Sequence, residues 1–288
     1  MKLLFVIIAH ITFFTVSAEN AKKSKVNEHS SISDNELFPY MAAILKKSSY
    51  ISAGALIDDS WILTGADALY TLRDIPRLLR IRLGSSNYKK GGVLSPVKMI
   101  HIHPHFDDSK PEFDLALVRL STAVTFSINL NPIRLLKKRR NLSMTHYIVT
   151  SWSIVSQEDP KTNSQGHESM EVVKRRRLLT KSHLHPTDAE ECGEQLQEQG
   201  VNVIESMLCL DTSVGMDPCE RETGAPAVLN GVLWGIISSW KSEDCDTVTE
   251  PTFVTLVSHI NVSSWIHATI HGHRWTRKHV VDYRDNFI

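Results

Sequence analysis

Short apolar runs separated by turn residues fill most of the chain from Leu37 onward. Up to residue 152 they read MAAIL, ALI, WILTGA, LLRIRL, MIHI, LALVRL and HYIVTSW, and further on MEVV, MLCL, PAVL, GVLWGII and TFVTLV. Runs of about four to eight residues, spaced about ten apart, are typical of strands in an antiparallel sandwich or barrel. A polar stretch from Gln157 to Glu168 separates the two sets. The pattern predicts an all-β protein built from two packed β modules.

Both ends of the chain differ from this pattern. In residues 1–18 a basic residue, an apolar run and a small-residue pattern follow one another, as in a secretory signal peptide. Residues 19–35 are polar and have almost no large apolar side chains, so they predict a flexible lead-in. Residues 256–270 space their apolar side chains as a helix does, and residues 271–288 form a tail without a clear period.

The location of the mature chain follows from its first segment. The apolar run from Leu3 to Val16 is shorter than the roughly 20 residues that a membrane-spanning helix needs, and no later segment is long and apolar enough. With 32 basic and 32 acidic residues, the formal net charge is zero, so the composition gives no electrostatic footprint for nucleic acid. We expect a secreted, extracellular protein with no membrane span and no nucleic-acid partner.

Secretion determines how the cysteines are interpreted. They lie in the last third of the chain and are Cys192, Cys209, Cys219 and Cys245. An even number in an oxidising compartment favours two disulfides over metal ligands. Three pairings are possible, and the residues alone do not select one. The sequons at Asn141 and Asn261 are candidate glycan acceptors, with an unused sequon as the alternative.

Two further patterns have both a functional and a structural interpretation. His101, His103 and His105 alternate and would share one face of a strand as metal ligands do, but the proline between the last two disrupts regular strand pairing. The basic runs 137–140 and 174–177 are candidate processing sites or polyanion-binding patches, or else solvated strand edges. We predict no metal site and no cofactor, and we keep polyanion or metal binding as an alternative.

Several segments, in chain order, resemble motifs of the trypsin/chymotrypsin family of serine peptidases (family S1). They are FPY (38–40), SAGALI (52–57), WILTGADA (61–68), HPHF (103–106), DLALVRL (114–120), VTSW (149–152), CERETGAP (219–226) and WI (265–266). In the family the second and third of these read CGGSLI and W-[VI]-L-T-A-A-H-C, and the seventh reads C-x-G-D-S-G-G-P. The resemblance covers about residues 38–270.

The resemblance implies the family's fold, two six-stranded antiparallel β-barrels with a C-terminal helix. The expected bounds are residues 36–270 for the whole domain, about 36–150 for barrel one, about 151–255 for barrel two and about 256–270 for the helix. It also implies which cysteines pair, namely Cys192 with Cys209 and Cys219 with Cys245. The disulfide of the family's first barrel is missing, because its two positions are occupied by Ser52 and Ala68.

The family's catalytic positions fall on Asp67, Asp114 and Thr223. Serine-peptidase chemistry needs a hydroxyl nucleophile, an imidazole that takes its proton and a carboxylate that orients the imidazole. Asp114 retains the carboxylate, whereas Asp67 replaces the histidine and Thr223 the serine. A carboxyl group with an ordinary pKa of about 3.9 is a poor base near pH 7, so the Thr223 hydroxyl should stay protonated and weakly nucleophilic.

The positions around the triad are altered as well. Arg221 and Thr223 occupy the oxyanion-hole positions, and the family has glycine where Arg221 should crowd the hole. Glu222 replaces the aspartate that pairs with a newly released N-terminus, and no activation-cleavage motif lies near Ile32. Asp217 falls where trypsin-like members hold the acidic floor of the S1 substrate pocket, with an ordinary surface aspartate as the alternative.

Together these features predict a secreted serine protease homologue that has lost catalysis and acts by binding. Its partner would be an extracellular protein, a protease or a protease substrate, with the chain as a cofactor or decoy in a proteolytic cascade. The alternative is a weak or unconventional trypsin-like endopeptidase. A second alternative is a polyanion- or metal-binding secreted protein.

Overall fold

A computed structural model describes most of the chain between residues 29 and 272. The described residues are 29–31, 37–137, 146–152, 154–157, 172–175, 177–198, 205–212, 219, 221–243, 245 and 250–272. The predicted signal peptide and nearly all of the predicted tail lie outside these residues. In the described part, no helix is long and apolar enough to cross a membrane.

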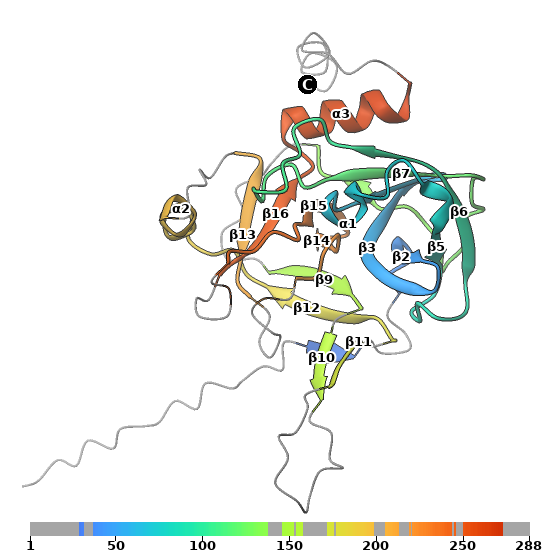
Figure 1. Cartoon of the computed structure of the whole chain (residues 1–288), viewed down its shortest axis with the longest axis horizontal. Helices are drawn as coiled ribbons and strands as arrows, with labels where there is room; N and C mark the ends of the chain where they lie inside the picture. Colours follow the sequence, from blue (N-terminus) through green and yellow to red (C-terminus); the bar gives the residue numbers. More distant parts are fainter. Residues whose placement is uncertain are drawn as a thin grey trace, which may run out of the picture.

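The first module is a closed barrel of six antiparallel strands (Figure 1). The strands are β2 (Met41–Lys46), β3 (Ser49–Asp58), β4 (Trp61–Thr64), β5 (Leu79–Leu83), β6 (Val93–Ile102) and β7 (Ala116–Leu120), in the order β2-β3-β4-β7-β6-β5. Buried side chains such as Ile44, Leu56, Ile81 and Val118 fill its interior. In β5 every second residue is buried, as expected for a strand with one face toward a core.

The second module is a curled sheet. Its six central strands are β12 (Thr180–Leu184), β9 (Tyr147–Ser151), β14 (Pro226–Leu229), β15 (Val232–Ile237), β16 (Thr252–Leu256) and β13 (Met207–Leu210), in that order. The two ends of the series meet where the Asp211 N–H donates to His185 O at 2.8 Å and the Thr187 N–H to Cys209 O at 3.1 Å. The module is therefore a half-barrel whose edge strands approach each other.

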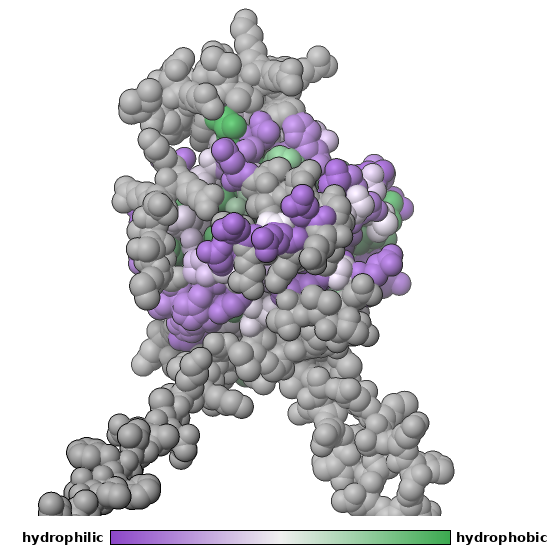
Figure 2. Space-filling model, turned by 90° about the vertical axis from the view of Figure 1, so that its left-hand side faces the viewer, coloured by the Kyte–Doolittle hydropathy of each residue, from purple (hydrophilic) through white to green (hydrophobic). Residues whose placement is uncertain are grey.

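Shorter elements complete the fold. They are β1 (His29–Ser31) on the outer edge of β12, β8 (Arg134–Leu135) parallel to β15, the hairpin of β10 (Ile154–Gln157) and β11 (Val172–Arg175), α1 (Asp67–Tyr70), the 3-10 turn η1 (Pro76–Leu78), α2 (Ala189–Glu198) and α3 (Ile260–Ile270). On the face of the molecule seen in Figure 2 the described residues are mostly hydrophilic. Polar side chains thus cover the core on that side.

The predicted fold class is confirmed, with differences in the bounds. Strand β9 pairs with β12 and β14, so the second module begins before residue 147 and not near 151. Three residues of the predicted flexible lead-in form β1. Helix α3 begins at Ile260, a few residues later than expected. Helix α2 was not predicted, because its sequence AEECGEQLQE has few apolar residues to show a period.

Both disulfides form as the resemblance implied. Cys192 of α2 is joined to Cys209 of β13, and Cys219 is joined to Cys245. All four belong to the second module, so covalent crosslinks hold that module and none joins described residues of the first barrel.

One apolar cluster spans both modules and fixes their relative position. It includes Met41 and Leu117 of the first barrel together with Trp152, Leu233 and Trp265. The Trp152 indole N–H also donates across the junction to Ser86 O at 2.9 Å. The three triad positions implied by the resemblance, Asp67, Asp114 and Thr223, lie at this junction.

Candidate active site

Asp114, just before β7, is buried at the junction of the two modules. Its Oδ1 accepts the backbone N–H of Ala66 at 2.6 Å and that of Asp67 at 3.0 Å. Its Oδ2 accepts the Ser238 hydroxyl at 2.8 Å, the Ser239 N–H at 2.8 Å and the Ser239 hydroxyl at 3.1 Å. Donors from both modules therefore hold a buried carboxylate in one orientation.

Asp67 begins α1 and brings a second carboxylate beside the first. The Ser239 hydroxyl lies between the two, since it hydrogen-bonds both Asp114 and Asp67. A hydroxyl has one proton, so it donates to only one of them at a time. Partial burial is the main cause that raises the pKa of Asp67; the Ser239 contact lowers it, and the charges of Asp114 and Asp108 raise it further.

Thr223, on the loop before β14, lies close to Gly65 and Asp114. Within the described residues its hydroxyl makes one hydrogen bond, to Arg221 O at 3.5 Å, which is at the outer limit for such a bond. A Cβ added at Gly65 would lie 3.5 Å from Thr223 Cγ2 and 3.5 Å from Asp114 Oδ1. The structure thus brings the three predicted triad positions together. The methyl group of Thr223, and not its hydroxyl, is the atom near Gly65 on the side where Asp114 lies.

Gly224 and Ser52 fix the backbone after Thr223. Gly224 has a φ of +74°, and a Cβ there would lie 2.3 Å from Ser52 Oγ, so only glycine fits. The Ser52 hydroxyl lies 3.0 Å from Thr64 Oγ1 and 3.1 Å from Thr223 O, and the Ala53 N–H donates to Thr223 O at 3.0 Å. Hydrogen bonds therefore link the modules at a position where the family has a disulfide cysteine.

The side chain of Arg221 turns inward and forms a buried ion pair. Its Nη2 lies 2.8 Å from Oε2 of Glu250, and each of the two side chains is only 4% exposed. The Ser242 N–H donates to both carboxylate oxygens of Glu250 at 3.2 Å, and the Thr212 hydroxyl donates to the Glu250 carbonyl. Burial of the guanidinium explains how arginine is accommodated where a glycine was expected.

Two residues just before Ser242 make contacts between loops. The Trp240 indole N–H donates to Ser109 O at 3.0 Å, and its ring packs edge-on against Phe253. The Lys241 ammonium donates to Cys219 O at 2.8 Å. The Lys241–Cys219 hydrogen bond and the Arg221–Glu250 ion pair therefore connect three loop segments that lie apart in sequence.

The sequence analysis missed Glu250, because it belongs to no recognisable motif. Residues 238–241 (SSWK) resemble the family's S-W-G pocket wall with one extra residue and a lysine in place of glycine, but the contacts of Ser239 with Asp114 and of Trp240 with Ser109 were not predicted. For Glu250 one signal was available. An arginine inside the motif before a buried strand needs a nearby acid, since an unpaired buried charge is very costly. The sequence cannot show that this acid is Glu250, because Arg221, Ser242 and Glu250 come together only when their three separate segments fold.

The alternating histidines do not share one face. Strand β6 ends at Ile102, and His103 beyond it stacks on Phe113 with ring centroids 4.9 Å apart, whereas His101 packs against Trp61 at 5.7 Å. Burial is the main cause that lowers the pKa of His103 to about 3. In the described part of the chain, no group of three or more His, Cys, Asp or Glu side chains is arranged to hold a metal ion.

The remaining predicted site residues are placed only in part. Asp217 and Asn141 lie outside the described residues. Asn261 is half-buried in the first turn of α3, and the hydroxyl of Ser263 in the same sequon donates to His259 O at 3.0 Å. Glycosylation at either sequon stays a prediction.

Comparison with known proteins completes the description of this site. The family model described as trypsin matches residues 26–266. The chain belongs to the trypsin family. It is 28% identical over 245 residues to granzyme M of Rattus norvegicus, covering 83% of this chain and 86% of that protein. It is 25% identical over 226 residues to hypodermin-A of Hypoderma lineatum, covering 78% and 80%.

The trypsin fold is shared with a solved structure as well. Neuropsin, a serine protease expressed in the limbic system of mouse brain, matches with a TM-score of 0.62 and 23% identity, over 81% of this chain and 94% of that one.

Proposed function

We propose that this trypsin-family chain is secreted and non-catalytic, and that it acts by binding an extracellular protein, a protease or a protease substrate. The observation that carries the proposal is the pair of acids at the site. Asp67 and Asp114 meet where the family's mechanism needs an imidazole beside a carboxylate, and Ser239 links the two carboxylates.

The chemistry of the hydroxyl supports the same conclusion. In comparable enzymes, loss of the nucleophile or the base alone costs about a million-fold in rate. In the described part of the chain the Thr223 hydroxyl has one hydrogen bond, to a backbone carbonyl of its own loop at 3.5 Å, and no side chain there accepts its proton.

The alternative, a weak endopeptidase, has one observation in its favour. Threonine can serve as a nucleophile, and the raised pKa of Asp67 moves that carboxyl toward the range of a useful base.

The purified mature protein should be incubated with a Lys/Arg fluorogenic peptide and with a fluorophosphonate probe. We expect no hydrolysis above buffer and no labelling. Hydrolysis that disappears in Thr223→Ala would establish the alternative instead.

Restoring the triad tests which features silence the site. The variant Asp67→His with Thr223→Ser should remain unlabelled by the fluorophosphonate, because Arg221 still occupies the oxyanion-hole position where the family has glycine. Adding Arg221→Gly with Glu250→Gln should increase labelling. Full activity in the first variant alone would show that the two triad substitutions are the whole cause.

Binding itself is tested by capture from native extracellular fluid with the mature chain immobilised. We expect a protease or a protease substrate to be retained at physiological salt. An unrelated trypsin-family protein with an intact, inhibitor-blocked site serves as the control. Retention of the same set of proteins on both would contradict a specific binding function for this chain.

A further inference from the structure

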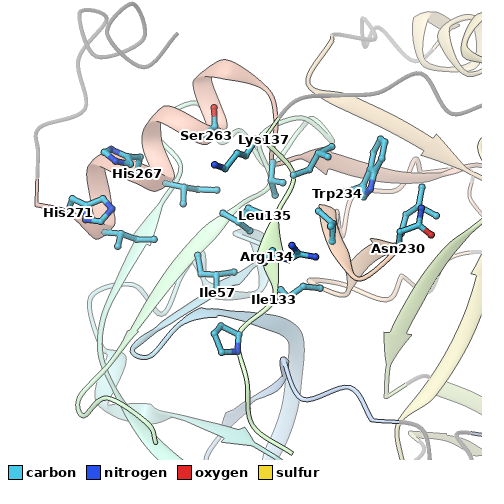
Figure 3. A pocket seen from close by; sticks show the side chains of 17 residues that line it. Ile57, Ile133, Arg134, Leu135, Lys137, Asn230, Trp234, Ser263, His267 and His271 are labelled. Atoms are coloured by element: carbon cyan, nitrogen blue, oxygen red, sulfur yellow. The ribbon is translucent and has the colours of Figure 1, made fainter. Parts of the chain in front are cut away.

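Two surfaces of the molecule contain none of the residues at the candidate active site. One is a groove of about 950 Å³ between α3 and the segment 132–137 (Figure 3). Side chains on its floor, such as Leu229, Trp234 and Ile266, are at most 8% exposed, so the groove offers a ligand little apolar surface to cover. The other surface lies on the first barrel, and it is charged.

Charge is unevenly distributed along the part of the chain that forms the first barrel. Residues 38–57 and 75–106, which contain β2, most of β3, β5 and β6, include eight Lys or Arg residues and no Asp or Glu. The whole chain has equal numbers of basic and acidic residues. Strand β5 pairs with both β2 and β6, so the imbalance in sequence becomes an imbalance on one side of the barrel (Figure 1).

Hydrogen bonds bring the cations of this side into one surface. The Lys89 ammonium donates to Ser48 O at 2.8 Å, which joins the β5–β6 loop to the β2–β3 turn. The Arg82 Nε–H donates to Tyr88 O at 2.9 Å, which joins β5 to the same loop. Arg80 lies two residues earlier on β5 and therefore shares a face with Arg82. We call this the basic surface, and its members are Lys46, Lys47, Arg80, Arg82, Lys89 and Lys90.

Acids of the chain do not neutralise the basic surface. Its four lysines are exposed and its two arginines are half-buried. The side chains of Arg80 and Arg82 donate to backbone carbonyls, and no member of the surface forms an ion pair with an acid in the described part of the chain. A surface with such an excess of one charge attracts anionic ligands, most strongly at low salt.

The exposed residues around these charges are small and polar. In the segments 46–49 and 77–90, every exposed residue is Lys, Arg or Ser. A protein partner would be expected to bury apolar and aromatic anchors at the centre of its interface. A sulfated polysaccharide instead carries closely spaced anionic groups and many hydroxyls, to which ammonium groups and serine hydroxyls can hydrogen-bond. The composition of the surface therefore favours the polysaccharide.

We propose that the basic surface binds a sulfated polysaccharide of the glycosaminoglycan type, which lies across the β2–β3 turn and the β5–β6 loop. Of the basic runs noted in the sequence, 137–140 and 174–177, only the second reaches this place. Its exposed Arg177 accepts the Tyr88 N–H at its carbonyl, at 3.2 Å. The preference for a polysaccharide over nucleic acid rests on the proposed secretion, whereas binding needs neither the triad positions nor the protein partner.

The test uses the full mature chain and a fluorescently labelled heparin fragment as the probe. We expect saturable binding at about 0.15 M salt. Affinity should fall steeply as salt rises, because binding releases counterions. Unlabelled heparin should displace the probe. Hyaluronan, which carries carboxylates but no sulfate, and double-stranded DNA should each compete about fivefold more weakly or less.

Paired variants locate the binding site. Lys47→Ala with Lys90→Ala should weaken probe binding about tenfold or more and make the dependence of affinity on salt shallower. Lys47→Arg with Lys90→Arg keeps both charges and should retain affinity within about twofold. The matched control, Arg134→Ala with Lys137→Ala, removes two exposed cations outside the basic surface and should also stay within about twofold. Equal urea midpoints show that the variants remain folded.

Four results would overturn the proposal. They are absence of displaceable binding at about 0.15 M salt, equal loss of affinity in the alanine pair and the matched control, loss of affinity in the arginine pair as well, and tighter binding of double-stranded DNA or anionic phospholipid vesicles than of heparin. Secretion is tested separately, by detecting the chain in the medium of cells that express it. Heparin binding by a chain that cells retain would contradict the proposed function and leave the site itself supported.

Discussion

At the scale of single residues, the ion pair of Arg221 and Glu250 shows how a charged substitution is tolerated in a buried motif. Both side chains are almost completely shielded from water, which removes much of their hydration. Their mutual attraction offsets this loss, and the backbone N–H of Ser242 adds hydrogen bonds to the carboxylate. Removing one partner should therefore harm the fold more than removing both.

This difference can be measured by urea denaturation. We expect Glu250→Ala to lower the free energy of unfolding by about 3–5 kcal/mol, because it removes the carboxylate that pairs with the buried Arg221 guanidinium. The double variant Arg221→Met with Glu250→Leu should cost clearly less than the single one. If the double variant were the less stable of the two, the pair would contribute net stability beyond satisfying its own charges.

A second residue-scale prediction concerns His103. Burial and the neighbouring His105 lower its pKa to about 3, against an ordinary value near 6.5, although a hydrogen bond with the Asn261 backbone acts in the opposite direction. Between these two pH values the unfolded chain binds a proton that the folded chain does not. Stability should therefore fall as pH falls through this window, by up to about 1.4 kcal/mol per pH unit from this group.

The measurement compares unfolding midpoints in urea at about pH 7 and pH 4.5. His101 and His259 are shifted in the same direction by burial, so they add to the slope of the unaltered chain. Replacing His103 by Phe, which keeps the stacking on Phe113, should make the pH dependence shallower. Identical slopes in the two proteins would mean that His103 is already protonated in the folded chain.

At the scale of elements, two glycines are needed for different reasons. One allows the backbone of a turn, and the other also leaves room for neighbouring atoms. Gly231, with φ +69°, follows Asn230 in the turn between β14 and β15, and a Cβ there would meet nothing within 4 Å. Both residues have positive φ, as a tight hairpin turn demands. Gly224 also has positive φ, but it lies against the first barrel at the site.

Alanine at each position should separate the two effects. Gly231→Ala should lower the free energy of unfolding by about 1 kcal/mol, the cost of a left-handed backbone with a Cβ. Gly224→Ala should cost about 3 kcal/mol or more, because the new methyl group would overlap Ser52 and the Ala53 carbonyl. Equal losses, measured by denaturant titration, would show that the loop at Thr223 can move away from the first barrel.

The sequence predicted these elements to different degrees. Buried strands such as MAAIL and GVLWGII were visible because each is apolar and bounded by turn residues. Helix α2 was not visible, since Cys192 holds it to β13 and a disulfide partner leaves no periodic signal. The triad positions could be located because motif residues keep their order along the chain. Glu250 and Ser239 could not, because their roles depend on contacts between segments far apart in sequence.

At the scale of the whole molecule, crosslinks are distributed unevenly between the modules. The two disulfides close loops of 17 and 26 residues in sequence, both in the second module. Loops of this length correspond to a stabilisation of about 3 kcal/mol each. At the junction the first barrel relies on hydrogen bonds from Ser52 and Ala53 to the carbonyl of Thr223.

Reduction should therefore affect the modules differently. After treatment with a reductant and a thiol cap, we expect amide hydrogen exchange to accelerate in β13 and α2 well before it does in the closed barrel β2 to β7. Untreated protein at the same temperature is the reference. If amide hydrogen exchange accelerated at the same time in both modules, they would unfold as one cooperative unit. The apolar cluster that spans both modules is compatible with that result.

The inward-turned guanidinium of Arg221 has a consequence for how inhibitors meet this protein. Amidines, and protein inhibitors that insert a lysine or arginine side chain, bind in a recess that contains an available acid, and here the buried carboxylate of Glu250 is already paired with the guanidinium of Arg221. The protein should pass unretarded through a benzamidine column that holds active trypsins, and retention there would show that the recess opens.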